Sequence, residues 1–99
     1  MDIIYHVTTR KSWEEAMARG FYLSPSLEAE GFIHCSQESQ VAGVLERYFE
    51  GQDNLVKLVI DTGKLSSKYV FDWSPSTADT FPHVYGPINL DAVTEVVDL

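Results

Sequence analysis

The stretch EGFIHCS, residues 30–36, decides how this chain is interpreted, because it is a strand-like segment that carries a histidine and a serine. In an extended strand, successive side chains point to opposite faces. The alternation predicts that His34 and Ser36 share one face and that Ile33 and Cys35 share the other. A polar face on an otherwise apolar strand indicates a site at this point of the sheet, whereas Cys35 is expected to pack inward as a small apolar residue.

Two main helices are predicted. Ser12 and Glu15 have the spacing of a capping box, and Gly20 suits the position after a helix end. The second helix is predicted from one apolar stripe, with Ser36 as its N-cap and Gly51 as its stop. The stripe consists of Val41, Val44, Leu45, Tyr48 and Phe49.

Runs of β-prone residues predict the sheet, and the run at residues 55–61 is apolar on both faces, as in a central strand. Residues 24–31 are predicted to form a loop or a single turn, and residues 74–80 a surface loop. Because strands outnumber helices and do not alternate with them, the expected class is α+β, with a small split or strongly bent antiparallel or mixed sheet. The other extended segments are residues 3–7, 21–23, 32–36, 68–73, 81–88 and 92–99.

Length and composition indicate one globular domain spanning residues 1–99, since single domains cluster at about 100–150 residues. An apolar content of 44% is too high for disorder. No membrane span or secretory signal is expected, and a single cysteine is consistent with a reducing cytoplasm. The net charge of −8 argues against nonspecific binding to nucleic acid, which depends on lysine and arginine.

All three histidines precede a hydroxyl by two residues, as His6-x-Thr8, His34-x-Ser36 and His83-x-Tyr85. On a strand such pairs lie side by side, so each strand presents an imidazole next to a hydroxyl. Imidazoles titrate near neutrality, and both groups donate and accept hydrogen bonds. Three pairs converging on one cleft would suit the ribose hydroxyls and phosphates of a nucleotide. For any single pair, a structural histidine that is merely hydrogen-bonded is the more common outcome.

Other candidate residues surround this pattern. Asp72, between Phe71 and Trp73, is the best acidic candidate, although a solvent-facing position is equally compatible with the sequence. Tyr85 can stack on a flat ring or pack as a half-buried residue. Gln40, one turn into the second helix, is a candidate for the same cleft, with a solvated surface position as the default.

The motifs IYHVTT, SLEAEGFIHCS, LVKLVID and FPHVYGPINLDAV together resemble a small bacterial family catalogued as domain of unknown function 952. The resemblance covers nearly the whole chain. That family is similar to a minimal ADP-ribosyltransferase-like fold, the group of the toxins, the poly-ADP-ribose polymerases and the RNA 2′-phosphotransferases. The resemblance implies a nucleotide-like ligand, with NAD as a candidate substrate and transfer at the ribose as the reaction.

The same resemblance implies roles for individual residues. A first-strand His-x-Thr contacts the adenosine ribose of NAD in that group, which places His6 and Thr8 in this role. Asp72 stands where a glutamate stabilises an oxocarbenium ion, but it is shorter. Tyr85 is a candidate for the tyrosine that stacks on nicotinamide, and Arg10 is the only arginine near the first motif. The phosphotransferases also carry a later His-x-Ser on a strand, which residues 34–36 resemble.

Two alternatives stay open. Three histidines and an aspartate could form the ligand set of a divalent metal, although the histidines are far apart in sequence and no metal is expected. In the other alternative the histidines are structural and the chain is a noncatalytic interaction module. The sequence therefore leaves the existence of an enzymatic activity undecided.

Overall fold

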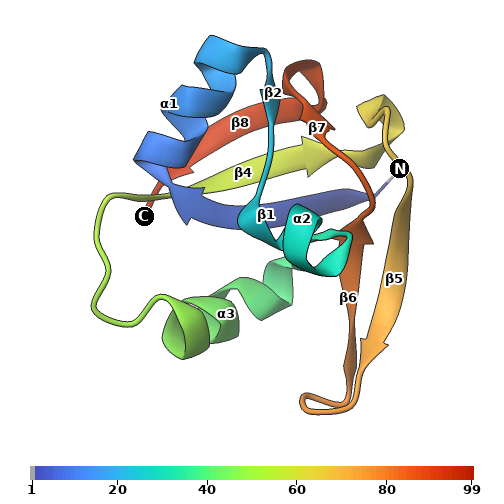
Figure 1. The fold of residues 1–99 in the computed structure, drawn as a ribbon. Coiled ribbons are helices and arrows are strands. Elements are labelled where there is room, and N and C mark those ends of the chain that lie inside the picture. The colour runs from blue at the N-terminus through green and yellow to red at the C-terminus, as the bar shows by residue number, and fades with distance from the viewer. Residues whose placement is uncertain (1) are drawn as a thin grey trace.

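The computed structural model describes residues 2–99, which form an α+β fold built around three small antiparallel sheets (Figure 1). One sheet has the strand order β1-β4-β8, a second pairs β2 with β7, and the third has the order β3-β6-β5. The strands are β1 (Ile3–Thr9), β2 (Phe21–Tyr22), β3 (Ile33–His34), β4 (Leu55–Asp61), β5 (Tyr69–Ser74), β6 (Asp79–Val84), β7 (Ile88–Asn89) and β8 (Val93–Asp98). The helices are α1 (Arg10–Arg19), α2 (Pro25–Glu30) and α3 (Val41–Tyr48).

The strand β4 is central in its sheet, as its two apolar faces predict, and pairs with β1 on one side and β8 on the other. Its side chains Leu58 and Ile60 are fully buried and pack with Ile4 of β1. The remaining members of this cluster come from β4 itself, from helix α1, and from the other two sheets and the segments beside them, so that one apolar cluster connects all three sheets. They are Trp13, Ala16, Tyr22, Ile33, Cys35, Val56, Val84, Ile88 and Ala92.

Helix α1 begins three residues earlier than its sequence pattern predicts. Thr9 is the N-cap, and its hydroxyl oxygen accepts a hydrogen bond from the backbone N–H of Ser12 at 3.1 Å. The predicted cap at Ser12 is therefore wrong. The side chain of Thr9 caps the helix three residues earlier, and Ser12 lies inside the first turn. The end is as predicted, since Gly20 adopts a left-handed conformation with φ of 102°.

Residues 25–30 form the short helix α2 where a loop or single turn is predicted. Ser24 caps its start, Pro25 occupies the first turn, and Gly31 ends it with φ of 89°. These are the residue types that favour the two ends of a helix. Although α2 contributes no fully buried side chain, it connects β2 to β3 and forms one side of the region described below.

Helix α3 follows a turn of 3-10 helix (Glu38–Gln40), and Ser36 does not cap it. Ser36 instead forms a β-bridge with Tyr5, with two backbone hydrogen bonds of 2.7 and 2.8 Å. This bridge joins the segment after β3 to strand β1. The predicted N-cap at Ser36 is therefore wrong, because its backbone is used in sheet pairing.

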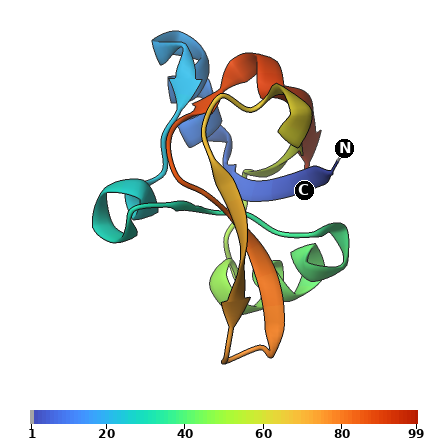
Figure 2. The same cartoon turned by 90° about the vertical axis from the view of Figure 1, so that its right-hand side faces the viewer.

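The hairpin of β5 and β6 and the helix α3 extend from the same side of the β1-β4-β8 sheet (Figures 1 and 2). Strand β3 pairs with β6 and, through Ser36, with β1, so it connects the hairpin to the sheet. This arrangement leaves a space bordered by β1, α2, α3 and the hairpin. Among residues 2–99, no helix is long and apolar enough to cross a membrane.

Candidate functional site

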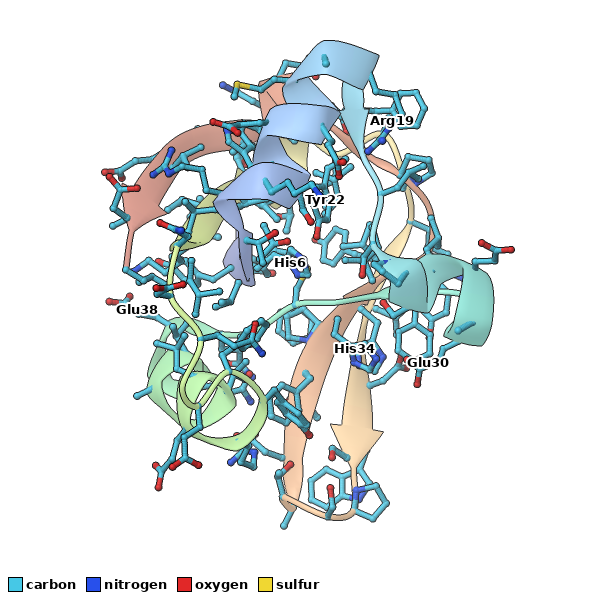
Figure 3. All side chains as sticks on the ribbon, turned by 60° about the vertical axis from the view of Figure 1, so that its left-hand side comes forward. His6, Arg19, Tyr22, Glu30, His34 and Glu38 are labelled. Atoms are coloured by element: carbon cyan, nitrogen blue, oxygen red, sulfur yellow. The ribbon has the colours of Figure 1, made fainter. Side chains whose placement is uncertain are left out.

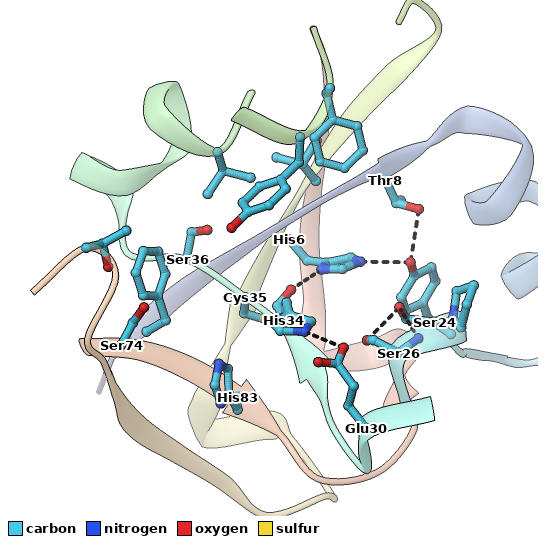
Figure 4. Close-up of a pocket in the computed structure, with 18 of the residues that line it drawn as sticks. His6, Thr8, Ser24, Ser26, Glu30, His34, Cys35, Ser36, Ser74 and His83 are labelled. Atoms are coloured by element: carbon cyan, nitrogen blue, oxygen red, sulfur yellow. Dashed lines mark hydrogen bonds and ion pairs between the residues drawn. The ribbon is translucent and has the colours of Figure 1, made fainter. Parts of the chain in front are cut away.

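A cavity of about 740 Å³ occupies this space (Figure 4). Its floor comes from β1 and β3, and its walls from α2, α3 and the β5–β6 hairpin. Polar residues, mostly with hydroxyl or imidazole side chains, line one part: His6, Thr8, Thr9, Ser24, Ser26, Glu30, His34, Ser36, Ser74, Thr77 and His83. The other lining residues are apolar, aromatic or sulfur-containing: Val7, Tyr22, Pro25, Cys35, Val44, Tyr48, Phe49, Trp73, Pro75 and Phe81.

The imidazoles of His6, His34 and His83 all line this one cavity. His34 and His83 are directly paired across β3 and β6, and their ring centroids lie 5.2 Å apart. His6, on β1, reaches β3 with its ring, because Nδ1 lies 2.5 Å from the backbone carbonyl oxygen of His34. The alternation of side chains in three separate strands thus brings three sequence-distant imidazoles together.

His6 is buried, and both nitrogens of its ring are engaged. Since the carbonyl oxygen of His34 can only accept, Nδ1 of His6 carries the proton. Nε2 lies 2.7 Å from the hydroxyl of Tyr22, and burial lowers the pKa of His6 to about 4. The ring is therefore neutral at pH 7, and Nε2 accepts a hydrogen bond from the Tyr22 hydroxyl.

Tyr22 is a site residue that the sequence pattern did not reveal. Its hydroxyl lies between His6 and Thr8, 2.9 Å from the Thr8 oxygen, and burial raises the pKa of this phenol (Figure 3). The residue comes from the two-residue strand β2, whose partner strand β7 lies far away in the sequence. No local signal identifies it, because its hydroxyl meets His6 only through tertiary packing.

His34 has a different environment, since it is exposed and its Nε2 lies 2.8 Å from the carboxylate of Glu30 (Figure 4). Glu30 is the last residue of α2 and, among residues 2–99, the only acidic residue that lines the cavity. Its spacing of four residues from His34 was visible in the sequence as E-x-x-x-H, and this was the signal that could have identified it.

Asp72 and Tyr85 form a group with His83 beside the cavity and do not line it. One carboxylate oxygen of Asp72 accepts hydrogen bonds from Nδ1 of His83, at 2.8 Å, and from the hydroxyl of Tyr85, at 2.5 Å. The hydrogen bond from Tyr85, followed by that from His83, lowers the pKa of Asp72. The structure therefore places Asp72 in contact with His83. The resemblance had instead implied a direct contact between Asp72 and the ligand.

Two further candidates lie outside the cavity lining. Arg10, at the start of α1, forms an ion pair with Asp98 of β8. Gln40 is buried, where a surface position was the default, and its side chain accepts from the backbone N–H of Gln37 at 2.8 Å. The Gln40 amide also donates to Asp79 and to the carbonyl of Thr80, at 2.9 and 2.8 Å, so it connects α3 to the hairpin.

The cavity carries little formal charge. No lysine or arginine lines it within residues 2–99, and Arg10 lies outside the lining, where it pairs with Asp98. Within the described part of the chain, no three or more His, Cys, Asp or Glu side chains are grouped to hold a metal ion. Cys35 also borders the cavity, but it is buried, and burial raises the pKa of its thiol.

Comparison with known proteins gives a family and a fold. Residues 7–96 match the sequence model of "Protein of unknown function (DUF952)". The crystal structure of protein CC0527 from Caulobacter crescentus has 33% sequence identity and a TM-score of 0.90, over 99% of this chain and 86% of that one. The solution structure of the same protein has 34% identity and a TM-score of 0.84, over 100% and 85% of the two chains. The search of the curated proteins found no match.

Proposed function

The chain belongs to the DUF952 family, and we propose that its cavity binds the nucleoside end of a nucleotide such as NAD and supports transfer at the ribose C1′. The observation that carries this proposal is the presence of three imidazoles in a single cavity with aromatic walls. Its volume of about 740 Å³ lies within the range of about 300–1,000 Å³ that is typical of small-molecule sites.

The polar side of the cavity suits a ribose. Hydroxyl and imidazole side chains donate and accept hydrogen bonds in the same way as the 2′- and 3′-hydroxyls of a sugar. Because both ring nitrogens of His6 are occupied and Thr8 is buried against the Tyr22 hydroxyl, contacts with the ribose come from the rings of His34 and His83. His6 contributes by holding the floor of the cavity in place.

The aromatic side suits a flat heterocycle. Trp73 on β5 and Tyr48 at the end of α3 line the cavity although they are 62% and 66% exposed. Exposed aromatic rings at a cavity are well placed to stack on a base, which would cover their apolar surface. Phe49 and Phe81 continue this wall.

Charge determines which part of the nucleotide enters. A diphosphate needs cationic partners, and within the described part of the chain no lysine or arginine lines the cavity. A nicotinamide ring carries a positive charge when it is joined to the ribose, and Glu30 is the carboxylate at the cavity. In this proposal the phosphates therefore lie outside the cavity, and Glu30 takes the charge-stabilising role that the sequence had suggested for Asp72.

A titration followed by NMR tests the proposal. We expect NAD, and nicotinamide riboside without its phosphates, to shift the backbone resonances of Thr8, His34 and Trp73, while residues of β8 stay unmoved. Nicotinamide riboside should bind within about tenfold of NAD, since the phosphates gain no contact. The proposal is wrong if neither compound shifts these resonances, as a noncatalytic module with structural histidines requires.

A further inference from the structure

The ring of His83 is held in one orientation by contacts with three side chains, those of Phe32, His34 and Asp72. It stacks on Phe32 with centroids 4.1 Å apart and an angle of 14° between the planes. The edge of the His34 ring faces it at 5.2 Å. These contacts fix the plane of the imidazole, and the hydrogen bond to Asp72 fixes its rotation within that plane.

The hydrogen bonds also fix the tautomer of His83. Asp72 is a carboxylate that already accepts a hydrogen bond from Tyr85, so it can only accept from Nδ1 of His83. Nδ1 therefore carries the proton, and in the neutral ring Nε2 has a free lone pair. Within residues 2–99, Nε2 of His83 makes no hydrogen bond, and the residue lines the cavity.

We propose that His83 is the proton acceptor of this cavity and that Asp72 is its positioning residue. This inference rests on the proposed function, because it assigns the residue that activates the nucleophile there. A histidine whose Nδ1–H is held by a carboxylate keeps its Nε2 available as a base, and the carboxylate stabilises the imidazolium that forms. Tyr85 in turn orients the carboxylate.

With NAD as substrate and water as nucleophile, the step balances without a further reactant. Nε2 of His83 takes a proton from water as the water oxygen bonds to the ribose C1′. The bond from C1′ to the nicotinamide nitrogen breaks, and its electron pair neutralises the ring. The products are ADP-ribose, nicotinamide and one proton, which His83 returns to solvent.

A purely structural role for the Asp72–His83 pair is the alternative, since the pair also connects two neighbouring strands. That role would require neither a free Nε2 nor an effect on turnover. The two roles are separable by measuring the tautomer of His83, the affinity for NAD and the release of nicotinamide.

The first measurement uses the full chain labelled with ¹⁵N, and correlates the ring nitrogens of His83 with its carbon-bound protons. In the unsubstituted protein we expect the proton on Nδ1. In Asp72→Asn we expect a mixture of the two neutral tautomers or mainly the Nε2–H form, because an asparagine amide can also donate a hydrogen bond. Tyr85→Phe should keep the Nδ1 proton. A proton on Nε2 in the unsubstituted protein overturns the proposal, and so does a tautomer that Asp72→Asn leaves unchanged.

The second measurement follows nicotinamide release from NAD, with binding measured on the same samples. General base catalysis contributes about 10²–10⁴-fold. His83→Gln should therefore lower the release rate at saturating NAD by at least about 100-fold, a larger change than any loss of affinity for NAD measured on the same samples. Asp72→Asn should lower the rate of nicotinamide release by about tenfold or more. Phe71→Ala, on the same strand but outside the cavity lining, serves as the control with an unchanged rate.

The outcomes separate this inference from the proposed function. If NAD binds but no nicotinamide is released, or if His83→Gln keeps the full rate, the proton-acceptor assignment is wrong and the binding proposal stands. If NAD does not bind, the proposed function fails. The tautomer measurement then still decides whether the contact between Asp72 and Nδ1 keeps Nε2 of His83 unprotonated.

Discussion

Nδ1 of His6 lies 2.5 Å from the backbone carbonyl oxygen of His34, so one histidine side chain directly supports the strand that carries another. The contact joins β1 to β3 at the floor of the cavity, next to the Tyr5–Ser36 bridge. It uses the backbone of His34 and leaves the ring of His34 free to face the cavity. His6 and His34 therefore have different functions, although their sequence surroundings are similar.

The first prediction contrasts these two residues. His6→Ala should lower the free energy of unfolding by about 2–4 kcal/mol, because it removes the side-chain partner of the His34 carbonyl and one of the two partners of the Tyr22 hydroxyl, and opens a space in the floor. His34→Ala keeps the carbonyl and removes an exposed ring, so we expect a loss below about 1 kcal/mol. Denaturant unfolding at pH 7 measures both, and equal losses would contradict the assignment.

The pH dependence of stability gives the second prediction. The pKa of His6 is lowered from 6.5 to about 4 in the folded chain, so between these values the unfolded state binds a proton that the folded state does not. Stability should therefore be complete above pH 6.5 and fall as the pH drops to about 4, by roughly 3 kcal/mol at most. The difference between the unsubstituted chain and His6→Gln isolates this part. A difference that is constant from pH 7 to pH 4 would show that His6 is not buried as a neutral ring.

The third prediction concerns Gln40. Gln40→Ala should cost about 1–3 kcal/mol of stability, since it removes the hydrogen bond that the Gln37 N–H donates and the amide contacts with the hairpin, all of them part-buried. Gln52→Ala is the matched control, because Gln52 is exposed and makes one hydrogen bond of 3.4 Å to Tyr48. Thermal unfolding of both variants measures the difference. A loss no larger than that of the control would place Gln40 at the surface.

The aromatic wall gives the fourth prediction. Trp73→Ala should weaken binding of nicotinamide riboside by about 5–150-fold, because stacking on one base contributes about 1–3 kcal/mol. Folding should be little affected, since Trp73 is 62% exposed. Phe71→Ala removes an aromatic ring from the same strand, at a residue outside the cavity lining, and should leave the affinity unchanged. Calorimetric titration compares the two, and equal affinities would exclude Trp73 as a stacking residue.

Cys35 provides the fifth prediction. Its side chain is 2% exposed, and burial raises the pKa of the thiol, so little reactive thiolate forms at pH 8. We expect a disulfide reagent such as DTNB to label the native chain at least about 100-fold more slowly than the chain in denaturant, where one thiol per chain reacts. Rapid labelling of the native chain would mean that the cavity exposes Cys35.

Much of the fold followed from local patterns. The alternation in the strands, the apolar run of β4 and the glycine after α1 depend on neighbouring residues, which the sequence displays directly. The ends of helices were less predictable because several residues compete for them. Ser12 has the spacing of a cap, but Thr9 lies one turn earlier and accepts a hydrogen bond from the backbone N–H of Ser12 itself.

Strand pleating alone is enough to predict the direction of some of the candidate side chains. His6, Thr8, His34, Ser36 and His83 line one cavity because each lies on or beside a strand at its edge. Tyr22 was missed because it reaches His6 across a tertiary contact. Arg10 lies outside the cavity lining because it begins a helix and forms an ion pair with Asp98 of β8.

The contacts of the buried imidazole also bear on how the chain reaches a unique pairing of its strands. Ile4 and His6 share one face of β1, opposite Ile60 and Leu58 of β4. Sliding β1 by two residues would leave every side chain on its original face, so apolar matching alone discriminates poorly against that error. Such a slide would, however, bring His6 opposite Ile60. The imidazole would then lose its hydrogen bonds to the His34 carbonyl and the Tyr22 hydroxyl. The hydrogen bonds of His6 at the floor of the cavity thus also help to specify the register of β1 against β4.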